Sequence, residues 1–414
     1  MSTLEKLIAQ LCPDGVEYKQ LGELGEFYSG LSGKSKDDFV DGNTRFISYM
    51  NVFSNLSTRT DIQDRVRVSD SEKQNVVEYG DALFTGSSET KEECGMASVM
   101  THRPCEKIYL NSFCFGFRLK DKQVFEPDFM KHLLRSFNIR KQISNTASGV
   151  TRFNVSKVRM AKVCLPIPPL PVQKEIVRML DEMTGLIDAL EEELAARKKQ
   201  YEWCRERLLT FGDDVEYKPL GEFCSYVRGV TYSKEQEAGS QIDSIGLLRA
   251  NNIELTSSRL LLEDVKYIKS TVKINSMQWL KKGDILICAG SGSREHIGKV
   301  AFIEHDMDFV FGGFMAAIRC KEKLVSKFLF HVLRSVPFKN HLGLVLNSST
   351  INNLKSECVY SFQLPIPPLH VQNKIVHTLD DMTALIAALE EELAARKQQY
   401  EYYRDKLLAF KRAG

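Results

Sequence analysis

The sequence repeats itself once, at a fixed offset of 199 residues. Segment 165–211 aligns without a gap on segment 364–410, and 33 of the 47 positions are identical. The same offset pairs 16–23 (VEYKQLGE) with 215–222 (VEYKPLGE). Each repeat is therefore a variable block followed by a near-constant block. Two copies are too few for a solenoid, and they indicate one chain that imitates a two-fold dimer. Such proteins usually bind something that is itself two-fold or two-part.

The composition limits the class of protein. A chain of 414 residues has room for two or three domains, and 43% hydrophobic with 27% charged residues predicts a soluble, globular protein. No apolar run is long enough to span a membrane, and residues 1–12 lack the features of a signal peptide, so we expect a cytoplasmic protein without membrane contact. The ten cysteines are scattered, without CxxC pairs or Cys/His clusters. This pattern predicts reduced thiols and no metal site.

Positive charge is concentrated in two runs at matching places of the repeats. The net charge is only +2, yet residues 129–174 and 323–356 contain no Asp or Glu. Basic surface without acidic neighbours is what phosphate neutralisation requires, although a solvated helix face is the simpler interpretation of a single run. Two matching runs favour nucleic acid. The basic residues are Lys131, Arg135, Arg140, Lys141, Arg152, Lys157, Arg159, Lys162 and Lys174, then Lys323, Lys327, Arg334, Lys339 and Lys355.

The near-constant block predicts a long helix. After the proline-rich segment 166–171 no proline occurs before Gly212, and apolar residues recur in steps of 3 and 4. This is a heptad seam, which needs a partner helix, and the obvious partner is the other copy. Arg197 and Arg396 interrupt both seams at one heptad position and could set the register by pairing with a flanking glutamate. The seam residues are Ile176, Leu180, Met183, Ile187, Leu190 and Leu194, then Ile375, Leu379, Met382, Ile386, Leu389 and Leu393.

Chain connectivity predicts that the two helices run antiparallel. The first helix begins where one variable block ends, and only residues 212–214 separate its far end from the next block. A second helix that packs along the first must run back, so the variable blocks are expected at opposite ends of a rod of about 57 Å. The amphipathic segment 4–11 would dock on the helix pair near the end of the chain.

The variable blocks are predicted to mix helices and short strands, which gives an α+β fold class with an internal pseudo-two-fold repeat. Expected strands are 44–50, 81–85, 112–119, 284–288 and 300–303, and expected helices are 127–144 and 326–341. The predicted division is an N-terminal segment (1–15), the first variable block (16–164), the first helix (165–211), the second variable block (212–363) and the second helix (364–414).

Catalytic motifs are missing from the sequence. The stretch nearest to a P-loop, residues 290–300, has the wrong glycine spacing, and IPPL lacks the flanking residues of an amino-methyltransferase motif. No GxGxxG after a strand, HExxH or GxSxG occurs. We therefore predict a non-catalytic chain.

The architecture resembles the specificity subunit of type I restriction-modification systems. The resemblance rests on two variable blocks, each closed by LPIPPL-x-x-Q and a heptad helix ending in ARKxQYExxRxxLL. It implies that each block is a target recognition domain for one half of a bipartite sequence in double-stranded DNA, with the helices as a ruler between them. It also implies two methyltransferase subunits, which use S-adenosylmethionine to methylate adenine N6, and two restriction subunits that require ATP and Mg²⁺. None of these cofactors is expected to bind this chain.

Polar loop residues next to glycine are the candidates for contact with DNA. Arg can bind guanine and Asn can bind adenine with two hydrogen bonds, although turns rich in Ser and Asn are common on any surface. The candidates of the first block are Lys34, Ser35, Lys36, Ser87, Ser88, Thr151, Arg152 and Asn154. Those of the second block are Arg249, Asn251, Asn252, Ser291, Ser293, Arg294, Thr350, Asn352 and Asn353.

Two other functions remain open from sequence. A coiled-coil scaffold or adaptor that holds two protein partners would explain the helices and the repeat, but not the paired basic runs. A self-sufficient nuclease or methyltransferase would require carboxylate clusters that spacing alone does not identify.

Overall fold

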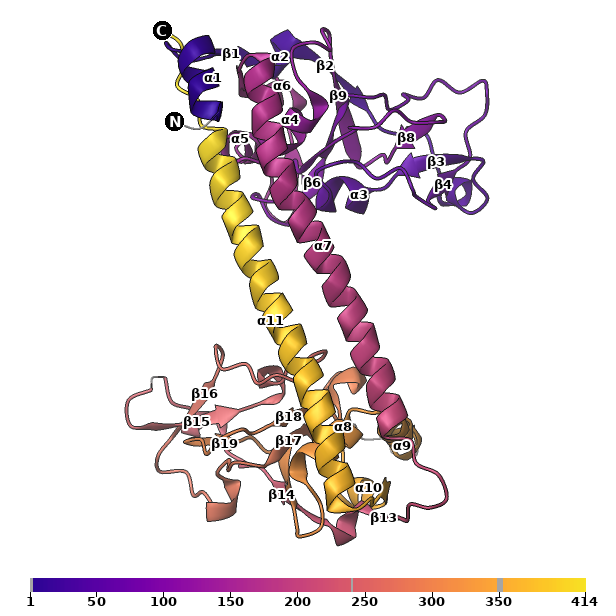
Figure 1. Ribbon diagram of the computed structural model, residues 1–414, viewed down its shortest axis with the longest axis vertical. Coiled ribbons are helices and arrows are strands. Elements are labelled where there is room, and N and C mark those ends of the chain that lie inside the picture. The colour runs from indigo at the N-terminus through magenta and orange to yellow at the C-terminus, as the bar shows by residue number, and fades with distance from the viewer. Residues whose placement is uncertain (1–2, 240, 348–352) are drawn as a thin grey trace. The chain divides into compact units, whose positions relative to one another are not determined.

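The computed structural model describes residues 3–239, 241–347 and 353–414 (Figure 1). It divides into two compact units, which are Met1–Glu191 with Glu391–Gly414 (unit 1) and Glu192–Glu390 (unit 2). Two 39-residue helices, α7 (Leu170–Leu208) and α11 (Leu369–Leu407), each contribute one segment to each unit. Among the described residues, no helix combines the length and the apolar character that a membrane span requires.

Unit 1 contains four small sheets. The largest is antiparallel with the order β2-β9-β5-β7, and a second, β4-β3-β8, pairs β3 with β8 in parallel. The third is β10-β11-β6, and the fourth pairs β1 with β12. The strands are β1 Glu17–Gln20, β2 Gly25–Ser29, β3 Thr44–Ile47, β4 Arg65–Val66, β5 Ala82–Thr85, β6 Ser87–Ser88, β7 Ala97–Val99, β8 Ile108–Leu110, β9 Cys114–Leu119, β10 Ala147–Ser148, β11 Phe153–Val155 and β12 Cys164–Ile167. The helices are α1 Thr3–Leu11, α2 Leu21–Leu24, α3 Tyr49–Ser54, α4 Pro127–Leu133, α5 Phe137–Ser144, α6 Lys157–Met160 and the 3-10 helix η1 Lys36–Phe39.

Unit 2 repeats the same plan with local changes. Its sheets are β14-β20-β17-β18, β16-β15-β19 and β13-β21, and β15 pairs with β19 in parallel as β3 does with β8. The strands are β13 Tyr217–Pro219, β14 Cys224–Arg228, β15 Ser244–Leu248, β16 Lys266–Lys269, β17 Ile285–Cys288, β18 Val300–Phe302, β19 Phe309–Phe311, β20 Met315–Cys320 and β21 Gln363–Pro365. The helices are α8 Ser326–Leu333, α9 Val336–Asn347 and α10 Ser356–Tyr360, with 3-10 helices η2 Leu220–Glu222, η3 Lys234–Gln236, η4 Ala250–Asn252, η5 Ser276–Gln278 and η6 Arg294–His296.

The shared Gly-Asp motif begins the central strand of each main sheet. Gly80 and Gly283 have φ values of 87° and 88°, which a glycine adopts without steric cost. The following carboxylates are buried, and each accepts two hydrogen bonds from one arginine, Asp81 from Arg118 and Asp284 from Arg319. A buried carboxylate needs such a partner, so the motif fixes the start of β5 and β17.

The helices predicted for 127–144 and 326–341 are each two helices, so the expectation of continuous helices was wrong. The breaks fall at Ser136 and Ser335, whose hydroxyls donate to Leu133 O and Val332 O. Carboxylates from the long helices cap the second helix of each hairpin. The amide of Phe137 donates to Asp405 at 2.8 Å, and the amide of Val336 donates to Glu206 at 3.0 Å. Local sequence could not reveal caps supplied by residues more than a hundred positions away.

The seam residues of the long helices lie inside each unit. In unit 1, Ile176, Leu180 and Ile187 share a core with Tyr400 of α11 and with Leu408, the residue after this helix. The corresponding core of unit 2 joins Ile375 and Leu379 of α11 to Tyr201 of α7. The remaining seam residues are half-buried: Met183, Leu190, Leu194, Met382, Ile386, Leu389 and Leu393.

Within each unit the segments of α7 and α11 run antiparallel. In unit 1 the beginning of α7 shares its core with the end of α11. Further along α7, Glu191 pairs at 2.6 Å with Lys397, which lies earlier in α11. In unit 2, Lys198 of α7 pairs with Glu390 of α11 at 2.7 Å. The seam arginines bind glutamates of their own helix, Arg197 to Glu193 and Arg396 to Glu392, each at 2.7 Å.

Candidate nucleic-acid interface

In unit 1 the structure brings two predicted segments together. Strand β11 pairs with β6, which places Asn154 opposite Ser87 and Phe153 opposite Ser88. Arg152 donates from Nε to the Ser87 hydroxyl at 3.1 Å. The side chains of Thr151, Arg152 and Asn154 are exposed, whereas Ser87 and Ser88 are buried beneath them. The exposed loop is therefore the part that a DNA duplex could reach.

Unit 2 has the same juxtaposition in reduced form. An isolated antiparallel bridge joins Gly290 to Asn353, at the position that the β6–β11 pair occupies in unit 1. Arg228 at the end of β14 donates to the Asn353 side chain at 2.7 Å and is exposed. Ser293 and Arg294 are exposed and Ser291 is half-buried. Two further candidates, Thr350 and Asn352, lie outside the described residues.

Sequence reasoning missed an exposed phenylalanine beside each of these loops. Phe113 precedes β9 and Phe314 precedes β20, and their exposed fractions are 61% and 73%. The amide of Gly86 donates to Phe113 O at 2.7 Å, and the amides of Ala289 and Gly290 donate to Phe314 O. The Arg152 guanidinium lies 5.9 Å from the centre of the Phe113 ring. The two turns have little local sequence in common, so only the paired strands reveal that the two rings are equivalent.

The remaining candidates lie elsewhere, and several of their side chains already make ion pairs or hydrogen bonds within the protein. Lys34 is ion-paired with Glu72, and only 6% of its side chain is exposed, while Ser35 caps the 3-10 helix that begins with the exposed Lys36. Arg249 and Asn251 both bind Asp264. Asn252 is 1% exposed and donates to two backbone carbonyls. In this structure Asn252, Ser87 and Ser88 hold their loops together, so base contact by them would require those loops to open.

Two arginines of the basic run of unit 1 are hydrogen-bonded inside the fold. Arg135 donates to the carbonyls of Val52, Phe53, Asn55 and Ala97, and Arg140 donates to those of Glu92, Cys94 and Gly95. Burial lowers the pKa of both guanidinium groups to about 10. The basic side chains of the run that stay exposed are Lys141, Arg152, Lys157, Arg159, Lys162 and Lys174. Only part of the run is therefore available to phosphates, because depletion of acids does not distinguish a surface arginine from one that binds backbone carbonyls.

A buried histidine ties each variable domain to both long helices. His132 of α4 contacts Asp181 of α7 at 2.7 Å through Nε2 and Tyr400 of α11 at 2.8 Å through Nδ1. Burial lowers the pKa of His132, and the hydrogen bonds to Asp181 from His132 and Lys131 hold the pKa of that carboxyl below its usual value despite its partial burial. The imidazole is therefore neutral at pH 7.

The equivalent histidine of unit 2 repeats these contacts with the long helices exchanged. His331 contacts Asp380 of α11 at 3.1 Å and Tyr201 of α7 at 3.4 Å. Burial lowers the pKa of His331 too. Each variable domain is thus held to the helix segments of its own unit by a buried histidine.

The glutamine of the LPIPPL-x-x-Q motif has a structural role in both units. Gln173 accepts the amide of Glu126 and donates to the carbonyls of Val124 and Pro168. Its counterpart, Gln372, makes the same three hydrogen bonds with Val325, Lys323 and Pro367. These bonds attach the first turn of each long helix to the loop that precedes α4 or α8.

Known proteins share this organisation. A family model described as the type I restriction modification DNA specificity domain matches the chain twice, at residues 13–197 and 212–396. The chain belongs to this family. Among the described residues, no group of three or more His, Cys, Asp or Glu side chains is arranged to hold a metal ion.

Curated relatives of the specificity family match the chain over different lengths. The specificity subunit of the type I restriction enzyme EcoR124I/EcoR124II from Escherichia coli is 29% identical over 267 residues, and the match covers 62% of this chain and 65% of the relative, just under two thirds. A putative MjaX specificity subunit from Methanocaldococcus jannaschii is 23% identical and is matched over 92% of its length and 96% of this chain.

Solved structures show the same fold. The S subunit of a type I restriction-modification system from M. genitalium matches with a TM-score of 0.56 at 12% identity, covering 95% of this chain and 96% of that one. A chain from a study of complex assembly and conformational transition in the type I R-M system matches with a TM-score of 0.58 at 18% identity, over 96% and 98% of the two chains.

Proposed function

We propose that this chain is the DNA-recognition subunit of a type I restriction-modification complex. Each variable domain reads one half of a bipartite site in double-stranded DNA, and the antiparallel coiled coil of α7 and α11 sets the unread spacer between the halves. The observation that carries the proposal is the double match to one DNA specificity domain within a single chain. Because the two recognition loops differ in sequence, the two half-sites are expected to differ as well.

The exposed loops beside β11 and Asn353 are the proposed reading surfaces. Arg152 and Asn154 in unit 1, and Arg228 and Asn353 in unit 2, present groups that bind bases or phosphates. Phe113 and Phe314 supply apolar contact to a base face or a thymine methyl group. The exposed lysines and arginines of the basic run around them would neutralise phosphates.

Partner subunits supply the chemistry in this proposal. Two methyltransferase subunits dock on the helices and use S-adenosylmethionine to methylate adenine N6, and two restriction subunits use ATP and Mg²⁺. This chain itself catalyses no reaction and binds none of these cofactors. The matching surfaces of α7 and α11 support two copies of one partner, because 33 of 47 positions are identical between the helix blocks.

Methylation mapping tests the proposal most directly. Co-expression of the chain with its methyltransferase partner, followed by mapping of modified adenines across the host genome, should yield one two-part motif with a constant spacer. Methylation without a bipartite motif would contradict the proposal. Turnover by the purified chain alone, with DNA, metal and S-adenosylmethionine, would show instead that it is an enzyme.

Salt dependence separates DNA recognition from a role as a protein scaffold. The affinity of the chain and its partner for a cognate duplex should fall steeply between low and moderate salt, since each phosphate contact releases counterions. Arg152→Gln should reduce the slope of log Kd against log salt by about 0.9. Phe113→Ala should weaken binding by about 1–3 kcal/mol without changing the slope, because no charge is removed. A flat response in the unmodified protein would favour the scaffold.

A further inference from the structure

Two equivalent pairs of basic residues have different surroundings in the two units. Arg135 and Arg140 lie on the α4–α5 hairpin, and the offset of 199 places Arg334 and Lys339 at the same positions of α8–α9. In unit 1 the helix α3, the residue after it, the segment before β7 and the first residue of β7 surround the two arginines. The backbone carbonyls of these segments accept seven hydrogen bonds from the two arginines. Both guanidinium groups are therefore already hydrogen-bonded within unit 1.

In unit 2 most of these partners are missing. Arg334 donates to the Tyr201 hydroxyl at 2.8 Å and to the carbonyl of Ser257 at 3.3 Å. The side chain of Lys339 is exposed and, among the described residues, makes no ion pair or hydrogen bond. The short 3-10 helix η4 stands where unit 1 has α3, so the backbone does not close over the hairpin.

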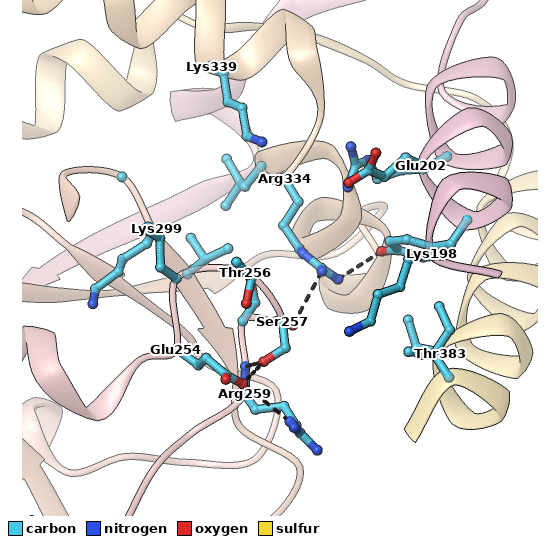
Figure 2. Close-up of a pocket in the computed structure, with 18 of the residues that line it drawn as sticks. Lys198, Glu202, Glu254, Thr256, Ser257, Arg259, Lys299, Arg334, Lys339 and Thr383 are labelled. Carbon is cyan, nitrogen blue, oxygen red and sulfur yellow. Dashed lines mark hydrogen bonds and ion pairs between the residues drawn. The ribbon is translucent and has the colours of Figure 1, made fainter. Parts of the chain in front are cut away.

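The consequence is a cavity of about 710 Å³ within unit 2, between the hairpin, the loop 254–259, α7 and α11. Figure 2 shows Arg334 and Lys339 entering it from the hairpin, opposite Ser257 and Arg259. Small-molecule sites usually enclose about 300–1,000 Å³, so the volume suits a ligand of nucleotide size.

The charge balance of the cavity favours an anion. Three of its four lining carboxylates are engaged. Glu390 pairs with Lys198 and Arg259, and Glu254 binds Ser257 and Arg259. Glu295 accepts a hydrogen bond from the Ser293 hydroxyl and lies 3.7 Å from His296. Glu202 is exposed on α7. Arg334 binds a hydroxyl and a carbonyl but, among the described residues, no carboxylate, and burial lowers its pKa. A largely buried cation that lacks a counter-ion is destabilised by desolvation, and a bound oxyanion would offset that cost.

We propose that this cavity binds a small polyanion that carries phosphate or carboxylate groups, held by Arg334 and Lys339. Guanidinium and ammonium groups both bind such oxyanions through charge-assisted hydrogen bonds. The site belongs to unit 2 alone, because Arg135 and Arg140 are already occupied by backbone carbonyls.

Calorimetric titration of the full-length chain at constant ionic strength tests the site, with pyrophosphate and citrate as probes. One of the two should bind with a single site, and the preference identifies phosphate or carboxylate as the recognised group. Arg334→Gln and Lys339→Gln should each weaken binding on the order of 10-fold. Lys141→Gln, which removes an exposed cation from the other hairpin, should leave it unchanged.

Three results would overturn the proposal. The first is no binding of either probe at millimolar concentration. The second is equal binding by Lys339→Gln and the unmodified chain, a comparison that does not depend on the buried arginine because Lys339 is exposed. The third is complete displacement of the probe by a short DNA duplex, which would make the cavity part of a DNA interface.

Discussion

Single buried side chains connect the variable domains to the long helices. His132 and His331 each join one domain to both helices, and Gln173 and Gln372 each satisfy three backbone groups at the start of a helix. Both units make these contacts although their exposed loops differ in sequence. The residues that hold a variable domain on the helices are therefore not the residues that differ between the two domains.

The histidines predict a dependence of stability on pH. Burial lowers their pKa in the folded chain below the ordinary value of 6.5. The unfolded chain therefore binds protons more readily, so the stabilisation is complete above about pH 6.5 and is lost as the pH falls below it. Urea unfolding between about pH 8 and pH 5.5 should show a falling free energy of unfolding. The variant His132→Asn/His331→Asn should show a flatter dependence, whereas the exposed His377→Asn should behave as the unmodified chain.

The glutamines predict a matched pair of destabilised variants. Gln173→Leu leaves an amide and two carbonyls without partners at a buried position, and Gln372→Leu does the same in the other unit. Each should lower the free energy of unfolding by about 2–4 kcal/mol, measured by denaturant titration. A loss in only one of the two variants would contradict the equivalence of the two attachments.

At the scale of elements, the helix hairpins depend on caps from the long helices. Asp405 of α11 caps α5, and Glu206 of α7 caps α9, so each hairpin is completed by a segment distant in sequence. The sequence predicted a continuous helix for each of the segments 127–144 and 326–341. The break is therefore decided by tertiary hydrogen bonds and not by local propensity.

The caps predict that Asp405→Ala and Glu206→Ala each lower the free energy of unfolding by about 1 kcal/mol. The control is Glu401→Ala, which removes an exposed carboxylate one helical turn before Asp405 in α11. It should have no measurable effect on the free energy of unfolding. Hydrogen exchange should show reduced protection first at the Phe137 amide in Asp405→Ala and at the Val336 amide in Glu206→Ala. Unchanged exchange at these two amides would exclude the capping role.

At the scale of the whole molecule, the proposed ruler is the coiled coil of α7 and α11. Each helix has 39 residues and contributes a segment to each compact unit, with the division after Glu191 and Glu390. These two positions differ by 199, so insertions there preserve the repeat.

Insertion of one heptad after Glu191 and one after Glu390 should lengthen the spacer by about 3 base pairs or abolish binding, since seven residues add about 10 Å. The readout is the methylated motif after co-expression with the partner. An unchanged spacer would refute the ruler, and a matched insertion in the loop 212–214 should leave the motif as it was.

Exchange of residues 215–363 for the variable block of a relative should change one half-site and leave the other intact. Each variable block contains its own sheets and core, so the exchange keeps the packing of the first block. A change in both half-sites would mean that the two domains do not read independently.

The sequence by itself determined the repeat, the extended proline-rich approach, the two long helices and the Gly-Asp strands, because periodicity and proline or glycine geometry act over a few residues. It also predicted that Asn154 and Asn353 are equivalent, since the offset of 199 holds to the end of each variable block. Only the tertiary structure decided which arginines are exposed, where the hairpins break, and that Phe113 and Phe314 stand beside the loops. The physical reason is that burial and hydrogen-bond partners come from segments far apart in the chain, and Arg135 and Arg334 differ only in what packs against them.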